Sequence, residues 1–89
     1  MTLKKERQKL ARKLRRGTKG ILPYRQYFSL AKILYDSSYN IPTWCDKFGY
    51  DCETWVKCTC CGPEGYIIKT PQGKFIVDHF HNEAWRISQ

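Results

Sequence analysis

Two short stretches carry the side chains that could do chemistry, CTCC at 58–61 and DHFH at 78–81. A Cys-x-x-Cys spacing supplies half of a tetrahedral zinc site, and two histidines could supply the other half. The candidate zinc ligands are Cys58, Cys61, His79 and His81. Two histidines separated by one residue on a strand hold a shared ion less well than the usual histidine spacing. We therefore expect no metal and no cofactor, with structural zinc as the alternative.

The cysteine pair, the β-rich run and Asp78-His79 together resemble the first half of phage recombination endonucleases of the His-Me finger type. In that family the His activates water and the Asp holds the metal. A following helix brings an Asn or His that completes the metal site, and a second cysteine pair binds structural zinc. Only NEAWRISQ follows His81 here, without further cysteines. Because a metal site needs its full ligand set, we expect no catalytic residues and no enzymatic activity. A metal-dependent nuclease or its degenerate relic is the alternative.

The net charge of +8 is confined to one end of the chain. Residues 1–20 hold nine basic residues and one acid, whereas residues 21–89 hold seven of each. Such a segment is an electrostatic footprint for a polyanion, and the rest of the chain is balanced. We therefore divide the chain into a basic N-terminal arm, 1–20, and a second domain, 21–89.

The arm sequence LKKERQKLARKLRRG predicts a cationic helix with a narrow stripe of Leu3, Leu10 and Leu14, ending at Gly17 as a C-cap. Like charges one turn apart make this helix marginal in isolation, so we expect it to become ordered on phosphates. Two other interpretations stay open: a solvated tail, and a homodimer that pairs two arms through the leucines. The stripe has no aromatic residue, which disfavours a membrane surface.

Periodicity predicts the elements of the second domain. A helix should cover 24–36 after Pro23, a short helix should cover Pro42–Phe48, and Asp51 should cap a third helix over CETWVKC. Two strands, GYIIK and KFIVD, should follow as a hairpin with TPQG as the turn.

The stretch IPTWCDKFGYDCETWVKC resembles a helix-turn-helix unit. In that family apolar, small and glycine residues recur at fixed positions, which are filled here by Trp44, Cys45, Phe48, Gly49, Tyr50, Trp55 and Cys58. With the hairpin as wing, the resemblance implies an α+β winged helix-turn-helix fold, three helices plus a two-stranded hairpin, preceded by the basic arm. It implies a DNA-binding transcriptional regulator of a virus or mobile element, with double-stranded DNA as its partner.

Basic residues and the exposed positions of the expected third helix would contact the nucleic acid. These residues are Lys4, Lys5, Arg7, Lys9, Arg12, Lys13, Arg15, Arg16, Lys19, Arg25, Thr54, Lys57, Lys69 and Lys74. The third helix also carries Asp51 and Glu53, which face phosphates poorly. Two alternatives follow: an RNA-binding or ribonucleoprotein component, and a module that docks a protein partner through the acidic helix.

The sequence contains no apolar run long enough to span a bilayer and no signal-peptide pattern. Its five cysteines are an odd number, which is atypical of a secreted disulfide framework. We therefore expect reduced thiols and a cytoplasmic protein, in the host cell if the source is viral.

Overall fold

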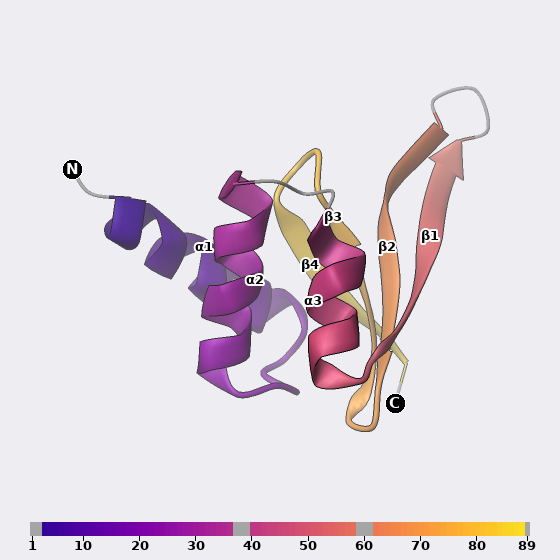
Figure 1. Cartoon of the computed structure of the whole chain (residues 1–89), viewed down its shortest axis with the longest axis horizontal. Coiled ribbons are helices and arrows are strands. Elements are labelled where there is room, and N and C mark those ends of the chain that lie inside the picture. Colours follow the sequence, from indigo (N-terminus) through magenta and orange to yellow (C-terminus); the bar gives the residue numbers. More distant parts are fainter. Residues whose placement is uncertain (1–2, 37–39, 59–61, 89) are drawn as a thin grey trace.

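The computed structural model describes residues 3–36, 40–58 and 62–88, which form three α-helices followed by four β-strands (Figure 1). In chain order the elements are α1 (Leu3–Gly17), α2 (Tyr24–Asp36), α3 (Ile41–Phe48), β1 (Asp51–Cys58), β2 (Gly62–Thr70), β3 (Gly73–Asp78) and β4 (Glu83–Ser88). The predicted α+β class is confirmed, but the sheet has four strands where we expected two.

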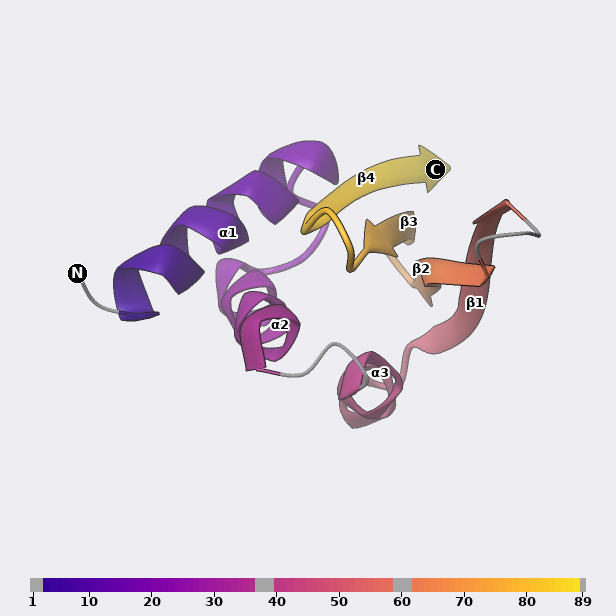
Figure 2. The same cartoon turned by 90° about the horizontal axis from the view of Figure 1, so that it is seen from above.

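The four strands form an antiparallel sheet in which each strand pairs with the next along the chain, in the order β1-β2-β3-β4. All three helices lie on one face of this sheet (Figure 2). The core lies between the two layers, where Trp44, Tyr27, Phe75, Leu30 and Val77 are fully buried. We call the face without helices the outer face of the sheet.

The basic helix α1 belongs to this core. Two of the three predicted stripe residues, Leu10 and Leu14, are buried with exposures of 5% and 0%, together with Ala11 at 0%. The side chain of Leu3 lies outside the described part. These side chains pack in one cluster with residues of α2 and of the sheet. The segment predicted as an arm is thus packed against the rest of the chain, and the protein itself buries Leu10 and Leu14, which could otherwise have paired two arms.

The C-terminal end of α1 lies against the backbone of β4. A Cβ atom placed on Gly17 would lie 1.8 Å from the carbonyl oxygen of Ala84. Residues with positive φ follow later, at Lys19 (62°) and Gly20 (65°). The helix ends at Gly17 as predicted, but the glycine is required by the close approach of the strand rather than by a left-handed cap.

A buried hydrogen-bond network fixes the turn between α1 and α2. The Thr18 side chain is fully buried, and its hydroxyl donates to the Leu14 carbonyl oxygen at 3.0 Å and contacts the Tyr27 hydroxyl. The Tyr27 oxygen in turn accepts a bond from the Leu22 N–H at 3.2 Å. Because every buried polar group in this set has a partner, the turn holds α1 and α2 in a defined orientation.

The structure confirms both helices predicted for residues 24–48. α2 spans the predicted residues, and α3 begins one residue earlier than expected, with Pro42 in its first turn. Gly49 ends α3 with a left-handed backbone (φ 75°), as its place in the turn predicted. Trp44 and Cys45 of α3 are buried in the core.

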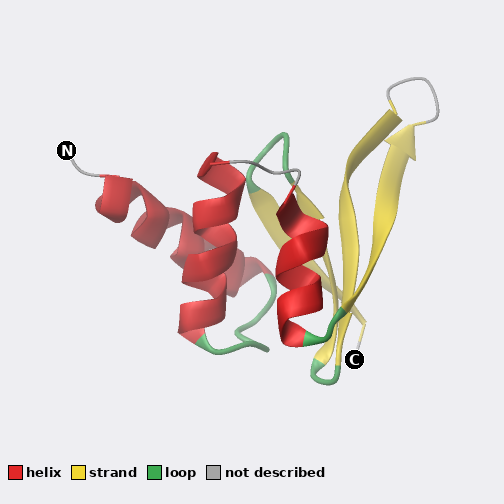
Figure 3. Ribbon diagram, in the orientation of Figure 1, coloured by secondary structure: helices red, strands yellow, loops and turns green. Residues whose placement is uncertain are grey.

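The predicted third helix is wrong, because residues 51–58 form strand β1 (Figure 3). Cys52 pairs with Ile68 and Trp55 with Gly65. Thr, Trp and Val favour the pleated conformation, and pairing with β2 satisfies the backbone polar groups along the strand. Trp55 consequently lies outside the core, and the winged helix-turn-helix architecture is not confirmed.

The predicted hairpin is confirmed and is the centre of the sheet. β2 and β3 pair from Gly65↔Asp78 to Thr70↔Gly73, closed by the predicted TPQG turn. On β4, Trp85 is partly exposed. Ala84 is the buried residue of β4, and Ile87 is 42% exposed.

We predict that Leu14→Ala lowers the free energy of unfolding by about 2–5 kcal/mol, because it leaves a cavity between α1, α2 and the sheet. Urea denaturation followed by circular dichroism would measure the change. Arg12→Ala, on the exposed side of the same helix, is the matched control and should cost less than about 0.5 kcal/mol. Equal effects of the two changes would contradict the packed position of α1.

A second prediction concerns Gly17. Alanine is favoured over glycine in a helix by about 1 kcal/mol, so Gly17→Ala would stabilise an α1 that was free of the strand. Because the added methyl group would collide with the Ala84 carbonyl oxygen, we expect Gly17→Ala to lower the free energy of unfolding and to separate α1 from β4. A lower urea midpoint would support the contact between α1 and β4, and a higher midpoint would contradict it.

Candidate nucleic-acid interface

One side of α1 carries a dense row of exposed positive charge. Lys5, Lys9, Arg12 and Arg16 recur at three- and four-residue intervals, which places them along one line of the helix. All four are exposed, and they lie opposite the buried leucines. The only acid among residues 1–20 is Glu6, and the basic Arg15 and Arg16 in the last turn also suit the helix dipole.

Three open grooves surround the C-terminal half of this row, and Arg16 borders all of them. The first, about 420 Å³, is lined by Arg12, Arg15, Arg16, Lys19 and Gly20. The second, about 370 Å³, is lined by Lys9, Leu10, Lys13, Arg16, Tyr35, His81 and Asn82. The third, which we call the α1–β4 groove, has about 420 Å³ and is lined by Lys13, Arg16, Gly17, Glu83, Ala84 and Trp85.

The structure therefore brings together the predicted binding residues of α1 and places the others elsewhere. Lys4, Lys13 and Arg15 are exposed on α1 with the row, Lys19 is exposed just after the helix, and Arg7 is half buried.

The remaining predicted residues lie on other elements. Arg25 is exposed in the first turn of α2, and Lys74 is exposed at the start of β3. Lys69 of β2 pairs with Glu53 at 3.5 Å. Thr54 is exposed on β1, and the side chain of Lys57 lies outside the described part. Because β1 is a strand, Thr54 and Lys57 do not form the groove-facing side of a helix.

The DHFH segment forms the turn between β3 and β4, with Asp78 at its centre. The side chain of Asp78 is buried, and its Oδ1 accepts bonds from the backbone N–H of Phe80 at 3.0 Å and of His81 at 3.2 Å. Its Oδ2 lies 2.8 Å from Nδ1 of His81. These contacts hold the turn, and they pair Asp78 with His81.

Glu64 approaches the same turn, so two carboxylates and an imidazole lie close together. Ligand atoms of Glu64, Asp78 and His81 all lie within 4.8 Å of one another. Such a set suits a divalent cation. Both carboxylate oxygens of Asp78, however, already hold the turn. Of the four predicted zinc ligands, Cys61 and the side chain of Cys58 lie outside the described part, and His79 and His81 lie in this turn.

His79 is turned away from this cluster. Its ring lies 6.0 Å from that of Tyr66 and 4.5 Å from that of Phe80. Its backbone N–H donates to the carbonyl oxygen of Glu64 at 3.2 Å, which extends the pairing of β2 and β3. The two histidines of the motif therefore have different surroundings.

Two thiols meet beneath α3. Cys45 is buried in the core and Cys52 lies opposite it on β1, both reduced. A hydrogen bond between the thiols lowers the pKa of Cys52, while the same bond and burial raise that of Cys45. Cys45 therefore keeps its proton and donates it toward the Cys52 sulfur.

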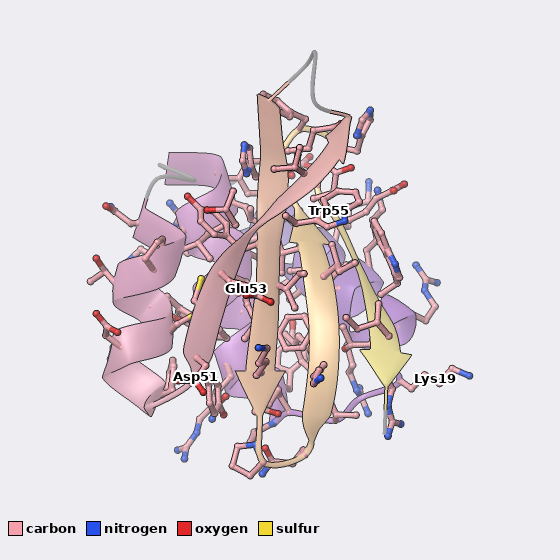
Figure 4. The ribbon with its side chains drawn as sticks, turned by 90° about the vertical axis from the view of Figure 1, so that its right-hand side faces the viewer. Lys19, Asp51, Glu53 and Trp55 are labelled. Atoms are coloured by element: carbon pink, nitrogen blue, oxygen red, sulfur yellow. The ribbon has the colours of Figure 1, made fainter. Side chains whose placement is uncertain are left out.

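The sequence interpretation missed an aromatic pair on the outer face of the sheet. Trp55 of β1 and Trp85 of β4 meet with ring centroids 5.4 Å apart and planes at 84°. Figure 4 shows Trp55 and Glu53 on this face, and Lys19 near the end of β4. Reading residues 51–58 as alternating, rather than helical, would have placed Trp55 there, because successive strand residues point to opposite faces.

We predict that Asp78→Ala costs about 1–3 kcal/mol, because two backbone N–H groups lose their acceptor. Asp78→Asn keeps the Oδ1 acceptor and should cost less. Urea denaturation of both variants, with and without added Mn²⁺ or Zn²⁺, would measure the effect. Stabilisation of the wild type by metal, absent in both variants, would show that the cluster binds a cation and is more than a turn.

Comparison of the chain with protein-family models, with curated proteins and with solved structures finds no significant match in any of the three. Within the described residues, the helices are all too short or too polar to cross a membrane.

Proposed function

We propose that this protein binds nucleic acid through the exposed basic row of α1. The observation that supports this most strongly is the contrast between the two sides of that helix. One side is buried with Leu10, Ala11 and Leu14, and the other presents Lys9, Arg12 and Arg16 with their neighbours. A phosphate backbone is the polyanion that such a row fits, because each neutralised phosphate releases counterions.

The packing of α1 favours binding further. A free cationic helix loses conformational entropy when it becomes ordered on a polyanion, whereas α1 is held by the core and by the Thr18–Tyr27 network. Preorganisation of this kind strengthens binding, because the ordering cost has already been met in folding. Leu10 and Leu14 are buried in the core, so these two side chains are not available to a lipid surface.

We do not extend this proposed function to the transcriptional regulator of double-stranded DNA expected from the sequence. That expectation required a DNA-recognition helix over residues 51–58, but these residues form strand β1. The nuclease alternative loses support in a similar way. In His-Me finger enzymes a helix follows the Asp-His segment, whereas here β4 follows it at Glu83.

We predict that Arg12→Gln/Arg16→Gln weakens binding and makes it less dependent on salt. Because the double variant would neutralise two fewer phosphates, the slope of log K against log salt should fall by about 1.4 to 1.8. Fluorescence anisotropy with labelled single-stranded and duplex DNA and RNA, across a salt series, would measure both quantities.

The matched control is Lys32→Gln/Lys47→Gln, which removes the same charge from exposed positions of α2 and α3. It should leave the salt slope nearly unchanged. Equal losses in the two double variants would mean that net charge, rather than the α1 row, drives binding. Absence of binding to every ligand at low salt would refute the proposed function.

A further inference from the structure

On the basis of the proposed binding by α1, we infer that the ligand is a single-stranded nucleic acid. Its phosphates lie along the α1–β4 groove, and a base stacks on the pair formed by Trp55 and Trp85. Trp85 connects two independent features of the molecule, the basic row and the aromatic pair. Trp85 lines the groove together with Lys13 and Arg16, and it also contacts Trp55.

The position of the two indoles makes them a platform. Trp55 and Trp85 come from β1 and β4, the two edge strands of the sheet. Their side chains meet over the two central strands, β2 and β3. The residue paired with Trp55 on β2 is Gly65, which adds no side chain beneath the rings. Ile76, the partner of Trp85, is only 8% exposed. The strand partners of the two tryptophans are therefore a glycine and an isoleucine, both uncharged.

The geometry of the pair leaves room for a base. The two ring planes lie at 84°, so the edge of one indole contacts the face of the other. Parallel stacking would cover one face of each ring, whereas this arrangement leaves more ring surface free for a base. Both tryptophans retain partial solvent exposure. Stacking of a nucleobase on such a ring is sequence-tolerant, because every base has a π-face.

The charge around the platform favours a nucleic acid over an apolar partner. On the helix side of β4 the groove offers Lys13 and Arg16 against the single acid Glu83. On the outer face Lys74 is exposed at the start of β3, and Glu53 is paired with Lys69. Cations beside an aromatic surface match a strand with phosphates on one side and bases on the other. In a duplex the bases are already stacked on one another and cannot reach a tryptophan, so a single strand is required.

The experiment compares three labelled ligands of about 12 residues, oligothymidylate, oligouridylate and an abasic phosphodiester chain, with a duplex of the same length. The abasic chain presents the phosphates without bases. We expect full-length protein to bind the base-containing strands roughly tenfold more tightly than the abasic chain, and to show quenched tryptophan fluorescence. The comparison of the first two ligands distinguishes DNA from RNA.

Trp85→Leu and Trp55→Leu should each remove most of that tenfold preference and leave affinity for the abasic chain unchanged. Trp85→Phe keeps an aromatic face and should retain much of the preference, which separates stacking from a structural role. Phe80→Leu, at a 65% exposed aromatic outside the pair, is the matched control and should have no effect. Circular dichroism confirms that each variant is folded.

Equal affinity for base-containing and abasic strands in the wild type would overturn the inference while leaving phosphate binding by α1 intact. Tighter binding of the duplex, unaffected by either tryptophan change, would overturn it as well. Absence of binding to all four ligands would instead refute the proposed function on which the inference rests.

Discussion

The rest of the structure depends on the burial of one side of a strongly cationic helix. Leu10, Ala11 and Leu14 anchor α1 in the core, and Gly17 lets its last turn touch the backbone of β4. With that side buried, most of the positive charge of residues 1–20 faces outward on a packed helix, and only Arg7 among the basic residues is half buried. The three grooves around Arg16 exist because α1 is held against α2, the β3–β4 turn and β4.

The single-layered sheet creates a second surface. All three helices cover one face, so alternation along each strand sends every other side chain to the outer face (Figure 2). On β1 and β4 these include Trp55 and Trp85, whose rings contact each other. Both surfaces meet at β4, because its Ala84 faces the core under α1 while Trp85 faces outward.

Local signals predicted the parts of the fold that local residues determine. The 3.6-residue periodicity gave the bounds of α2, Gly49 gave the end of α3, and the TPQG turn gave the central hairpin. Two features depended on distant partners. Residues 51–58 become a strand because β2 offers them a paired edge, and α1 packs because α2 and β4 complete its core. The basic row was predictable from charge alone, but the Trp55–Trp85 contact required the sheet register.

The packing of α1 also couples binding to stability. Lysines and arginines one turn apart, such as Lys9 with Lys13 and Arg12 with Arg16, repel each other along the exposed side of the helix. Burial of the leucines opposes this repulsion in the free protein. A bound phosphate backbone removes it, and a ligand that binds only the folded state stabilises that state by mass action. The same side chains that attract a nucleic acid therefore weaken the free helix, so that ligand binding and the packing of α1 on β4 reinforce each other.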